Sequence, residues 1–224
     1  MLFRCNILAL VGGGKSPKWP NNKVMLWDDH QLKCIGELSF GGEVKAVKLR
    51  KDKVVVVLQM KIYVYNFADL TLIDCLDTCN NPQGLCALNP DTNVAVLAIP
   101  HTEKGHVKVR NFSQDKQGET TIPTHQGSIA AMALNRNGEL LATASEKGTL
   151  VRVWNTTKGK AVCIFRRGAD KAEIRDLQFS KNNTFMSVSS DHPTIHLFKI
   201  DLSNADAVGN AIDDAGLDEE AKED

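Results

Sequence analysis

The sequence repeats a short apolar segment five times at a nearly constant interval. The five segments are KVMLWD (23–28), KIYVYNF (61–67), HVKVRNF (106–112), LVRVWN (150–155) and TIHLFKI (194–200). When Trp27, Tyr65, Arg110, Trp154 and Phe198 are aligned, the spacings are 38, 45, 44 and 44 residues. An interval of roughly 40 to 45 residues is that of a propeller blade with four strands. The repeat therefore predicts an all-β, WD40-like β-propeller, with the five segments as the outer strands that end comparable units.

The fourth unit displays the internal order of a blade most clearly. Its sequence, SIAAMALNRNGELLATASEKGTLVRVWNTTKGKAVCIF (128–165), contains four apolar or β-branched runs separated by three turns that contain glycine. Glycine and asparagine supply the positive φ angles that tight hairpin turns need. Helical periodicity is absent before residue 201. We therefore expect residues 1–200 to form a partial propeller of four-stranded blades, followed by an acidic, disordered tail at 201–224.

The formal charge is zero overall but is divided unevenly along the chain. Residues 201–224 hold nine acidic residues and one lysine, which leaves 26 basic and 18 acidic residues in 1–200. This division predicts a solvated acidic tail on a body that prefers an anionic partner. The six cysteines include no CxxC pair, so neither a zinc site nor a disulfide framework is expected. No window approaches the roughly 20 apolar residues of a membrane span, which favours a cytosolic or nuclear protein.

Two short motifs suggest catalysis but fail on spacing. The run VGGGKS (11–16) lacks the first glycine of a phosphate-binding loop, where this chain has Ala9, and Pro17 follows where a helix should begin. Ser190, Asp191 and His192 are consecutive, whereas a catalytic triad is assembled from separate parts of a fold. We expect no enzyme activity, no catalytic residue, no cofactor and no metal ion.

The stretch CIFRRGADKAEI (163–174) places two arginines at the end of an apolar run. Successive side chains of an extended segment point to opposite sides, so Arg166 and Arg167 should serve two different sites. A guanidinium group offers a planar fork of donors suited to phosphate. The opposing interpretation is a solvated strand edge that deters strand pairing.

Several motifs that occur in order resemble the PROPPIN family, whose members are seven-bladed WD-like propellers that bind phosphoinositides. They are TASEKGTLVRVWN (143–155), FRRG (165–168) and SVSSDHPTIHLFKI (187–200), and the N-terminal segments also resemble the WIPI branch. The resemblance implies binding to phosphatidylinositol 3-phosphate and phosphatidylinositol 3,5-bisphosphate. It also implies a role as an autophagy effector that recruits other autophagy proteins to its blade faces. We expect a cytoplasmic monomer, peripheral on autophagosomal or endolysosomal membranes, without a nucleic-acid partner.

The resemblance implies two phosphoinositide sites on either side of one blade, with Phe165 and Gly168 completing the FRRG motif. The first site would use His125, Ser145, Thr149, Arg152 and Arg166; the second would use Arg167, Ser189, Ser190, Thr194 and His196. Alternative interpretations remain for three of these residues. His125 could bond a backbone turn, Arg152 could pair with Glu146 or Asp170, and His196 could be an ordinary residue of a polar strand face.

The sequence departs from the family pattern at two levels. Pro193 replaces a turn glycine, which puts the second site in doubt. About five of the seven blades are represented, so we expect an open or incomplete ring. The acidic tail cannot replace the bilayer-inserting loop of the family, which predicts weaker membrane binding. The alternative is a protein-binding WD-like scaffold with vestigial lipid sites, and a propeller hydrolase is disfavoured.

Overall fold

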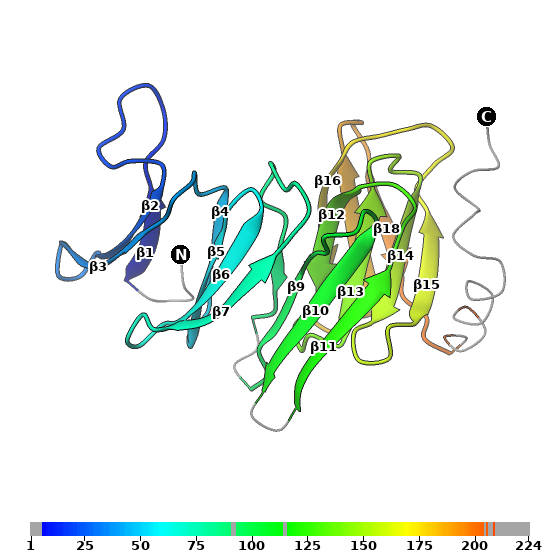
Figure 1. Cartoon of the computed structure of the whole chain (residues 1–224). Helices are drawn as coiled ribbons and strands as arrows, with labels where there is room; N and C mark the ends of the chain where they lie inside the picture. The colour runs from blue at the N-terminus through cyan, green and yellow to red at the C-terminus, as the bar shows by residue number, and fades with distance from the viewer. Residues whose placement is uncertain (1–5, 91–92, 114–115, 204, 206–207, 209–224) are drawn as a thin grey trace. The chain divides into compact units, whose positions relative to one another are not determined.

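The computed structural model describes residues 6–90, 93–113, 116–203, 205 and 208. These residues form 18 strands in five antiparallel sheets of three or four strands (Figure 1). The all-β prediction is thereby confirmed. The chain divides into two compact units, Met1–Gly84 and Leu85–Asp224. The predicted tail lies mostly outside the described residues, so its disorder stays a prediction.

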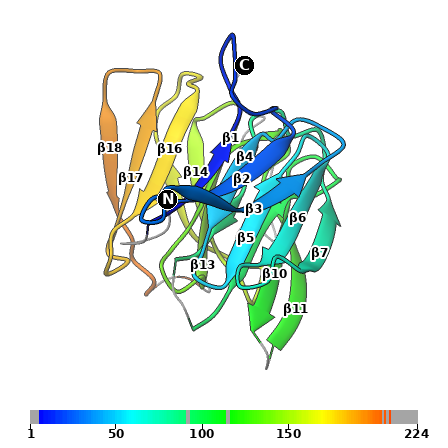
Figure 2. The same cartoon turned by 90° about the vertical axis from the view of Figure 1, so that its left-hand side faces the viewer.

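The first unit contains two sheets (Figure 2). One sheet consists of β1 (Ile7–Val11), β2 (Lys23–Asp28) and β3 (Lys33–Ser39), and the other of β4 (Ala46–Leu49), β5 (Lys53–Val57), β6 (Lys61–Asn66) and β7 (Leu72–Asp77). Val24 and Leu26 of the first sheet pack with Val54 and Val56 of the second in one hydrophobic cluster. Each sheet alone would leave this apolar face in water, so the two are stable only when packed together.

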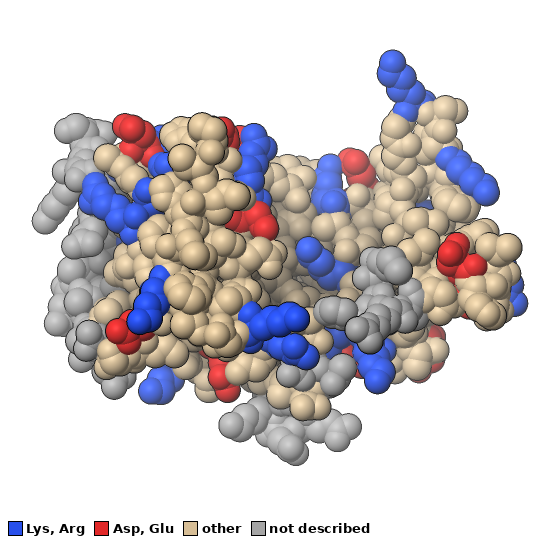
Figure 3. Space-filling view, turned by 180° about the vertical axis from the view of Figure 1, so that it is seen from behind, with Lys and Arg blue, Asp and Glu red and all other residues tan. Residues whose placement is uncertain are grey.

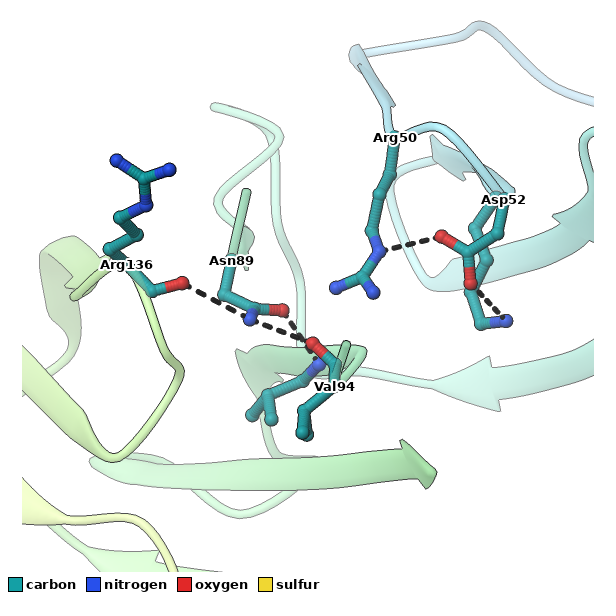
Figure 4. Close-up of polar contacts among 7 residues, drawn as sticks. Arg50, Asp52, Asn89, Val94 and Arg136 are labelled. Carbon is teal, nitrogen blue, oxygen red and sulfur yellow. Dashed lines mark hydrogen bonds and ion pairs between the residues drawn. The ribbon is translucent and has the colours of Figure 1, made fainter. Parts of the chain in front are cut away.

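An ion pair closes the β4–β5 turn of the first unit. Arg50 is 3% exposed, and its Nε donates a hydrogen bond to Asp52 Oδ1 at 2.6 Å (Figure 4). Burial acts to raise the pKa of Asp52, but hydrogen bonds from Lys53 and Arg50 outweigh it and hold this pKa below its usual range. The folded unit therefore favours the ionised carboxylate of Asp52.

The second unit contains three sheets. They are β8 (Ala87–Leu88), β9 (Val96–Pro100), β10 (His106–Ser113) and β11 (Lys116–Pro123); β12 (Ile129–Leu134), β13 (Leu140–Ser145), β14 (Leu150–Asn155) and β15 (Ala161–Arg166); and β16 (Ile174–Phe179), β17 (Phe185–Ser190) and β18 (Ile195–Lys199). The sheet β12–β15 contributes to two hydrophobic clusters. Leu141 and Trp154 belong to a cluster with β9–β11, whereas Val151 and Val153 belong to a cluster with β16 and β17.

Four of the five repeated segments are inner strands, which corrects the prediction that they are outer strands; the fifth, β18, lies at the edge of its sheet among the described strands. The segment LVRVWN is β14, which pairs with β13 on one side and with β15 on the other. The equivalent β2, β6 and β10 are likewise followed by a further paired strand. In β14 both faces are covered, because Val151 and Val153 pack with β16 and β17 whereas Trp154 packs with β9–β11, and this accounts for the apolar character of the strand. The sheets β1–β3 and β16–β18 also have three described strands rather than four.

Turn glycines connect neighbouring sheets of the second unit. Gly138 has φ of 78° in the β12–β13 turn, and a Cβ there would lie 2.7 Å from Val96 Cγ2. Beside it, the fully buried Asn89 donates from Nδ2 to the carbonyl oxygens of Val94 at 2.8 Å and Arg136 at 3.3 Å (Figure 4). The close approach requires glycine, and the asparagine satisfies carbonyls that would otherwise be buried without a donor. The prediction that glycine supplies positive φ in these turns is confirmed.

Two local observations complete the fold. Cys34 and Cys75 are exposed on outer strands, whereas Cys86 and Cys163 are buried. Within the described residues, no helix has the length and apolar character that crossing a bilayer would require.

Candidate functional site

Arg166 and Arg167 stand at the end of β15, in two different surroundings. Arg166 is the last residue of the strand, pairs in register with Leu150, and is exposed. Arg167 is 7% exposed, and its backbone nitrogen donates to the carbonyl oxygen of Thr149 at 2.8 Å. The two side chains therefore do not share one environment, as the alternation argument predicts.

The guanidinium of Arg167 connects three loops. Its Nε donates to the carbonyl oxygen of Gly148 at 2.7 Å, and its Nη2 donates to the carbonyl oxygen of Asp170. Its Nη1 lies 3.5 Å from Nδ1 of His192 in the β17–β18 turn. Because Gly148 has φ of 69° and a Cβ there would lie 2.0 Å from the carbonyl oxygen of Ala172, the loops are already in close contact. Arg167 acts as a structural tie between them.

The remaining residues of the second predicted site gather around the β17–β18 turn. Ser189 pairs in register with Ile195, and Ser190 Oγ accepts a hydrogen bond from the backbone nitrogen of His192 at 3.3 Å. Thr194 is exposed, and its Oγ1 lies 3.4 Å from His196 Nε2. These polar groups lie on one hairpin. Arg167 contacts the same hairpin at His192, a residue that the sequence did not assign to either site.

Pro193 is accommodated in this turn. Positive φ angles outside glycine occur in the described chain at Leu32, Leu70 and Asn183, and so at no residue of the β17–β18 turn. A proline, whose φ is fixed near −65°, therefore causes no backbone strain at this position. The turn does not need the glycine that the family pattern has.

The residues of the first predicted site, apart from Arg166, lie inside the protein. His125 and Ser145 are each 1% exposed, Arg152 is 2% exposed, and Thr149 is 6% exposed. Arg152 Nη1 donates to the carbonyl oxygen of Thr124 at 2.8 Å and lies 3.2 Å from His125 Nδ1. A guanidinium has no acceptor, so Nδ1 of His125 accepts and the ring proton is on Nε2.

The other side of the His125 ring continues this buried network. His125 Nε2 lies 3.1 Å from Thr143 Oγ1, which also accepts a hydrogen bond from Trp154 Nε1 at 2.9 Å. Both ring nitrogens of His125 are thus engaged by protein groups. These ring contacts are with the side chains of Thr143 and Arg152, and they give His125 a structural role in the buried network. Thr143 and Trp154 were not predicted as partners, although Trp154 was already a marker of the repeat.

The two other motif residues flank the arginine pair. The ring of Phe165 stacks on Phe198 of β18 with centroids 4.9 Å apart, and Phe198 in turn stacks on His196 at 6.1 Å. This contact joins β15 to β18 at the base of the second predicted site. Gly168 is partly exposed, and a Cβ there would meet no atom within 4 Å. The surroundings of Gly168 therefore give no steric reason for a glycine.

Basic side chains are distributed over the surface in several groups. On the face drawn in Figure 3, lysine and arginine side chains alternate with acidic ones, and no single basic patch covers the face. In the part of the chain that the structure describes, no three His, Cys, Asp or Glu side chains are placed to hold a metal ion.

Comparisons with known proteins identify relatives across most of the chain. A sequence profile of the PROPPIN family matches residues 14–211. Autophagy-related protein 18e of Arabidopsis thaliana is 42% identical over 201 residues, which are 89% of this chain and 53% of that protein. SVP1-like protein 2 of Schizosaccharomyces pombe is 32% identical over 89% of this chain and 55% of that protein. The crystal structure of Hsv2 of Kluyveromyces marxianus has a TM-score of 0.76 at 27% identity, over 90% of this chain and 62% of that one.

The repeated antiparallel sheets and the likeness to Hsv2 define a protein of the WD-like β-propeller class. Within this class, the chain belongs to the PROPPIN family. Its relatives include autophagy-related proteins, and the chain spans about half the length of those it matches.

Proposed function

We propose that this chain binds phosphoinositide headgroups at the end of β15 and acts as a non-enzymatic effector and scaffold in autophagy. The observation that carries the proposal is the exposed position of Arg166 at a strand end, next to an Arg167 whose donors order the adjoining loops. Membership of the PROPPIN family supports the ligand class. The expected ligands are phosphatidylinositol 3-phosphate and phosphatidylinositol 3,5-bisphosphate.

The predicted site residues divide into two roles under this proposal. Residues that are exposed or half-buried contact the phosphates; these are Arg166, Ser189, Ser190, Thr194 and His196. The buried residues, which are His125, Ser145, Thr149 and Arg152, support the strands from inside. Arg167 belongs to both roles, because its Nη1 faces the exposed His192 while its other nitrogens bind carbonyl oxygens.

A protein of this kind would associate with membranes at their surface. Phosphate is held by charge-assisted hydrogen bonds, which are about twice as strong as neutral ones. Binding of this kind would hold a cytoplasmic protein peripherally on phagophore, autophagosomal or endolysosomal membranes. Other autophagy proteins would dock on its blade faces.

Liposome flotation tests the proposal. Wild-type protein should float with vesicles that contain phosphatidylinositol 3-phosphate but not with vesicles that contain unphosphorylated phosphatidylinositol. Arg166→Ala should lose most of this binding, whereas Lys158→Ala, a change of an exposed cation in the β14–β15 turn, should keep it. Equal retention of wild type and Arg166→Ala would refute the lipid site.

The second candidate is a protein-binding scaffold whose lipid sites are vestigial. It is favoured by the engagement of the Arg167 guanidinium and of both His125 ring nitrogens by protein groups. This candidate predicts capture of an autophagy partner that is unchanged when phosphoinositide vesicles are omitted. Lipid-dependent capture would exclude it.

A further inference from the structure

The β17–β18 turn holds the exposed imidazole of His192 beside the Arg167 guanidinium. Asp191 fixes the turn to the preceding loop, because its backbone nitrogen donates to the carbonyl oxygen of Glu173 at 3.0 Å and its Oδ1 accepts from the Glu173 nitrogen at 3.0 Å. Ser190 Oγ accepts from the His192 nitrogen at 3.3 Å. Pro193 follows and restricts the backbone of His192 to extended conformations. The backbone that carries the imidazole is therefore held in place.

The contact between the two side chains depends on the protonation state of His192. Arg167 Nη1, which can only donate, lies 3.5 Å from His192 Nδ1. As a hydrogen bond, this contact has Nδ1 as the acceptor, which fits a neutral imidazole with its proton on Nε2. A histidine side chain ordinarily gains its second proton between about pH 5 and pH 8. Once Nδ1 carries a proton it can no longer accept from Arg167, and Nη1 loses its acceptor.

Charges of both signs surround this pair. The loop after β15 carries Asp170, Lys171 and Glu173, the β13–β14 turn carries Glu146 and Lys147, and Asp191, Arg166 and His196 are the neighbouring groups on β15 and the β17–β18 hairpin. The backbone atoms of Lys147 and Glu173 are used to join these loops. Arg175 is ion-paired with Glu173 at 3.0 Å. Protonation of His192 adds one positive charge to this mixed surrounding.

We propose that His192 is a pH-sensitive member of the anion site at Arg167. In its neutral form the imidazole caps Nη1 of the guanidinium. In its protonated form it releases Nη1 and supplies a second cationic donor, so that a phosphomonoester is bound by Arg167 and His192 together. This inference rests on the proposed function and adds a residue and a pH dependence to it.

The direction of the effect follows from the charges. A phosphomonoester is an anion throughout this pH range, so binding should strengthen as the pH falls through the range in which a histidine side chain ordinarily gains its second proton. Partly exposed charge pairs are worth up to about 1 kcal/mol, which corresponds to about a fivefold change in affinity. The phosphate itself also titrates near pH 6. The comparison that isolates His192 is therefore wild type against a non-titrating variant at each pH.

Vesicle binding at two pH values tests the inference. The probes are phosphatidylcholine vesicles with phosphatidylinositol 3-phosphate, at about pH 5.5 and about pH 7.5. His192→Gln keeps a side-chain acceptor for Arg167 but cannot gain a charge. We expect the ratio of the wild-type affinity to the His192→Gln affinity to be about three to five times larger at the lower pH than at the higher pH. His30→Gln, a change of an exposed histidine in the other unit, should follow wild type at both.

A second arm uses the soluble headgroup inositol 1,3-bisphosphate in calorimetry. The same low-pH advantage of wild type over His192→Gln is expected there, because the contact is with phosphate rather than with the bilayer. If wild type binds more tightly than His192→Gln at low pH only when the phosphate is on vesicles, the inference is wrong and the effect comes from the surface charge of the protein. If Arg166→Ala abolishes binding while His192→Gln follows wild type at both pH values, the inference is wrong and the lipid site stands. If Arg166→Ala binds as wild type does, the proposed function fails and the inference with it.

Discussion

Replacing Thr143 by valine removes a single hydroxyl on which two buried donors depend. Thr143 is fully buried, and its Oγ1 accepts from Trp154 Nε1 at 2.9 Å and from His125 Nε2 at 3.1 Å. Valine has nearly the same shape, so packing is preserved while both N–H groups lose their acceptor. A buried donor without a partner costs about 1 to 3 kcal/mol, so the two together should cost about 2 to 6 kcal/mol.

Urea denaturation measures this free energy of unfolding. Two variants serve as controls: Thr143→Ser keeps the hydroxyl and should lose much less, and Thr157→Val, at an exposed turn position, should stay within about 0.5 kcal/mol of wild type. Circular dichroism follows the transition, because the fluorescence of Trp154 overlaps that of Trp19 and Trp27 in the first unit. A loss below about 1 kcal/mol in Thr143→Val would show that the network does not stabilise the unit as the hydrogen bonds imply.

Three further predictions follow from local geometry and charge. Gly148→Ala should destabilise by more than about 1 kcal/mol, because of its positive φ and the 2.0 Å approach to the carbonyl of Ala172; a thermal melt unchanged from wild type would contradict this. The basic partners of Asp52 lower its pKa in the folded state, against the opposing effect of burial. The carboxylate should therefore stabilise the fold at a pH above its unfolded pKa of about 3.9, and this stabilisation should be lost as the pH falls through the lower folded pKa. Melting temperatures measured across this window should therefore fall more steeply for wild type than for Asp52→Asn. Burial raises the pKa of the Cys163 thiol, so iodoacetamide should label exposed Cys34 first in a mass-spectrometric time course, and the reverse order would refute this.

The repeat in the sequence was sufficient to predict the sheets but not the order of strands within each sheet. The segment LVRVWN marks its unit because both faces of β14 are covered, and an apolar run of this kind does not reveal whether the strand is the third or the last. The strand that follows, AVCIFR, is also apolar and is largely buried along its first half. Strand order is therefore a property of packing between sheets.

The arginine pair illustrates what can be predicted about the site. The different surroundings of Arg166 and Arg167 could be predicted, because successive side chains of an extended segment point to opposite sides and this depends only on the local backbone. The binding of Arg167 to carbonyl oxygens of two loops depends on backbone geometry, for which side-chain identity gives no signal. The burial of Arg152 could be predicted more readily from the sequence, because Arg152 and Trp154 are two residues apart and so lie on one face of an apolar strand.

The most direct test of the central claim is the affinity of inositol 1,3-bisphosphate for wild type and Arg166→Ala, measured by isothermal titration calorimetry. A charge-assisted hydrogen bond from a guanidinium contributes about 1.5 to 3 kcal/mol, so the variant should bind about 10- to 100-fold more weakly. Arg166 is exposed, and its replacement should leave the melting temperature unchanged. Equal affinities for two equally stable proteins would contradict the assignment of the β15 end as the phosphoinositide site.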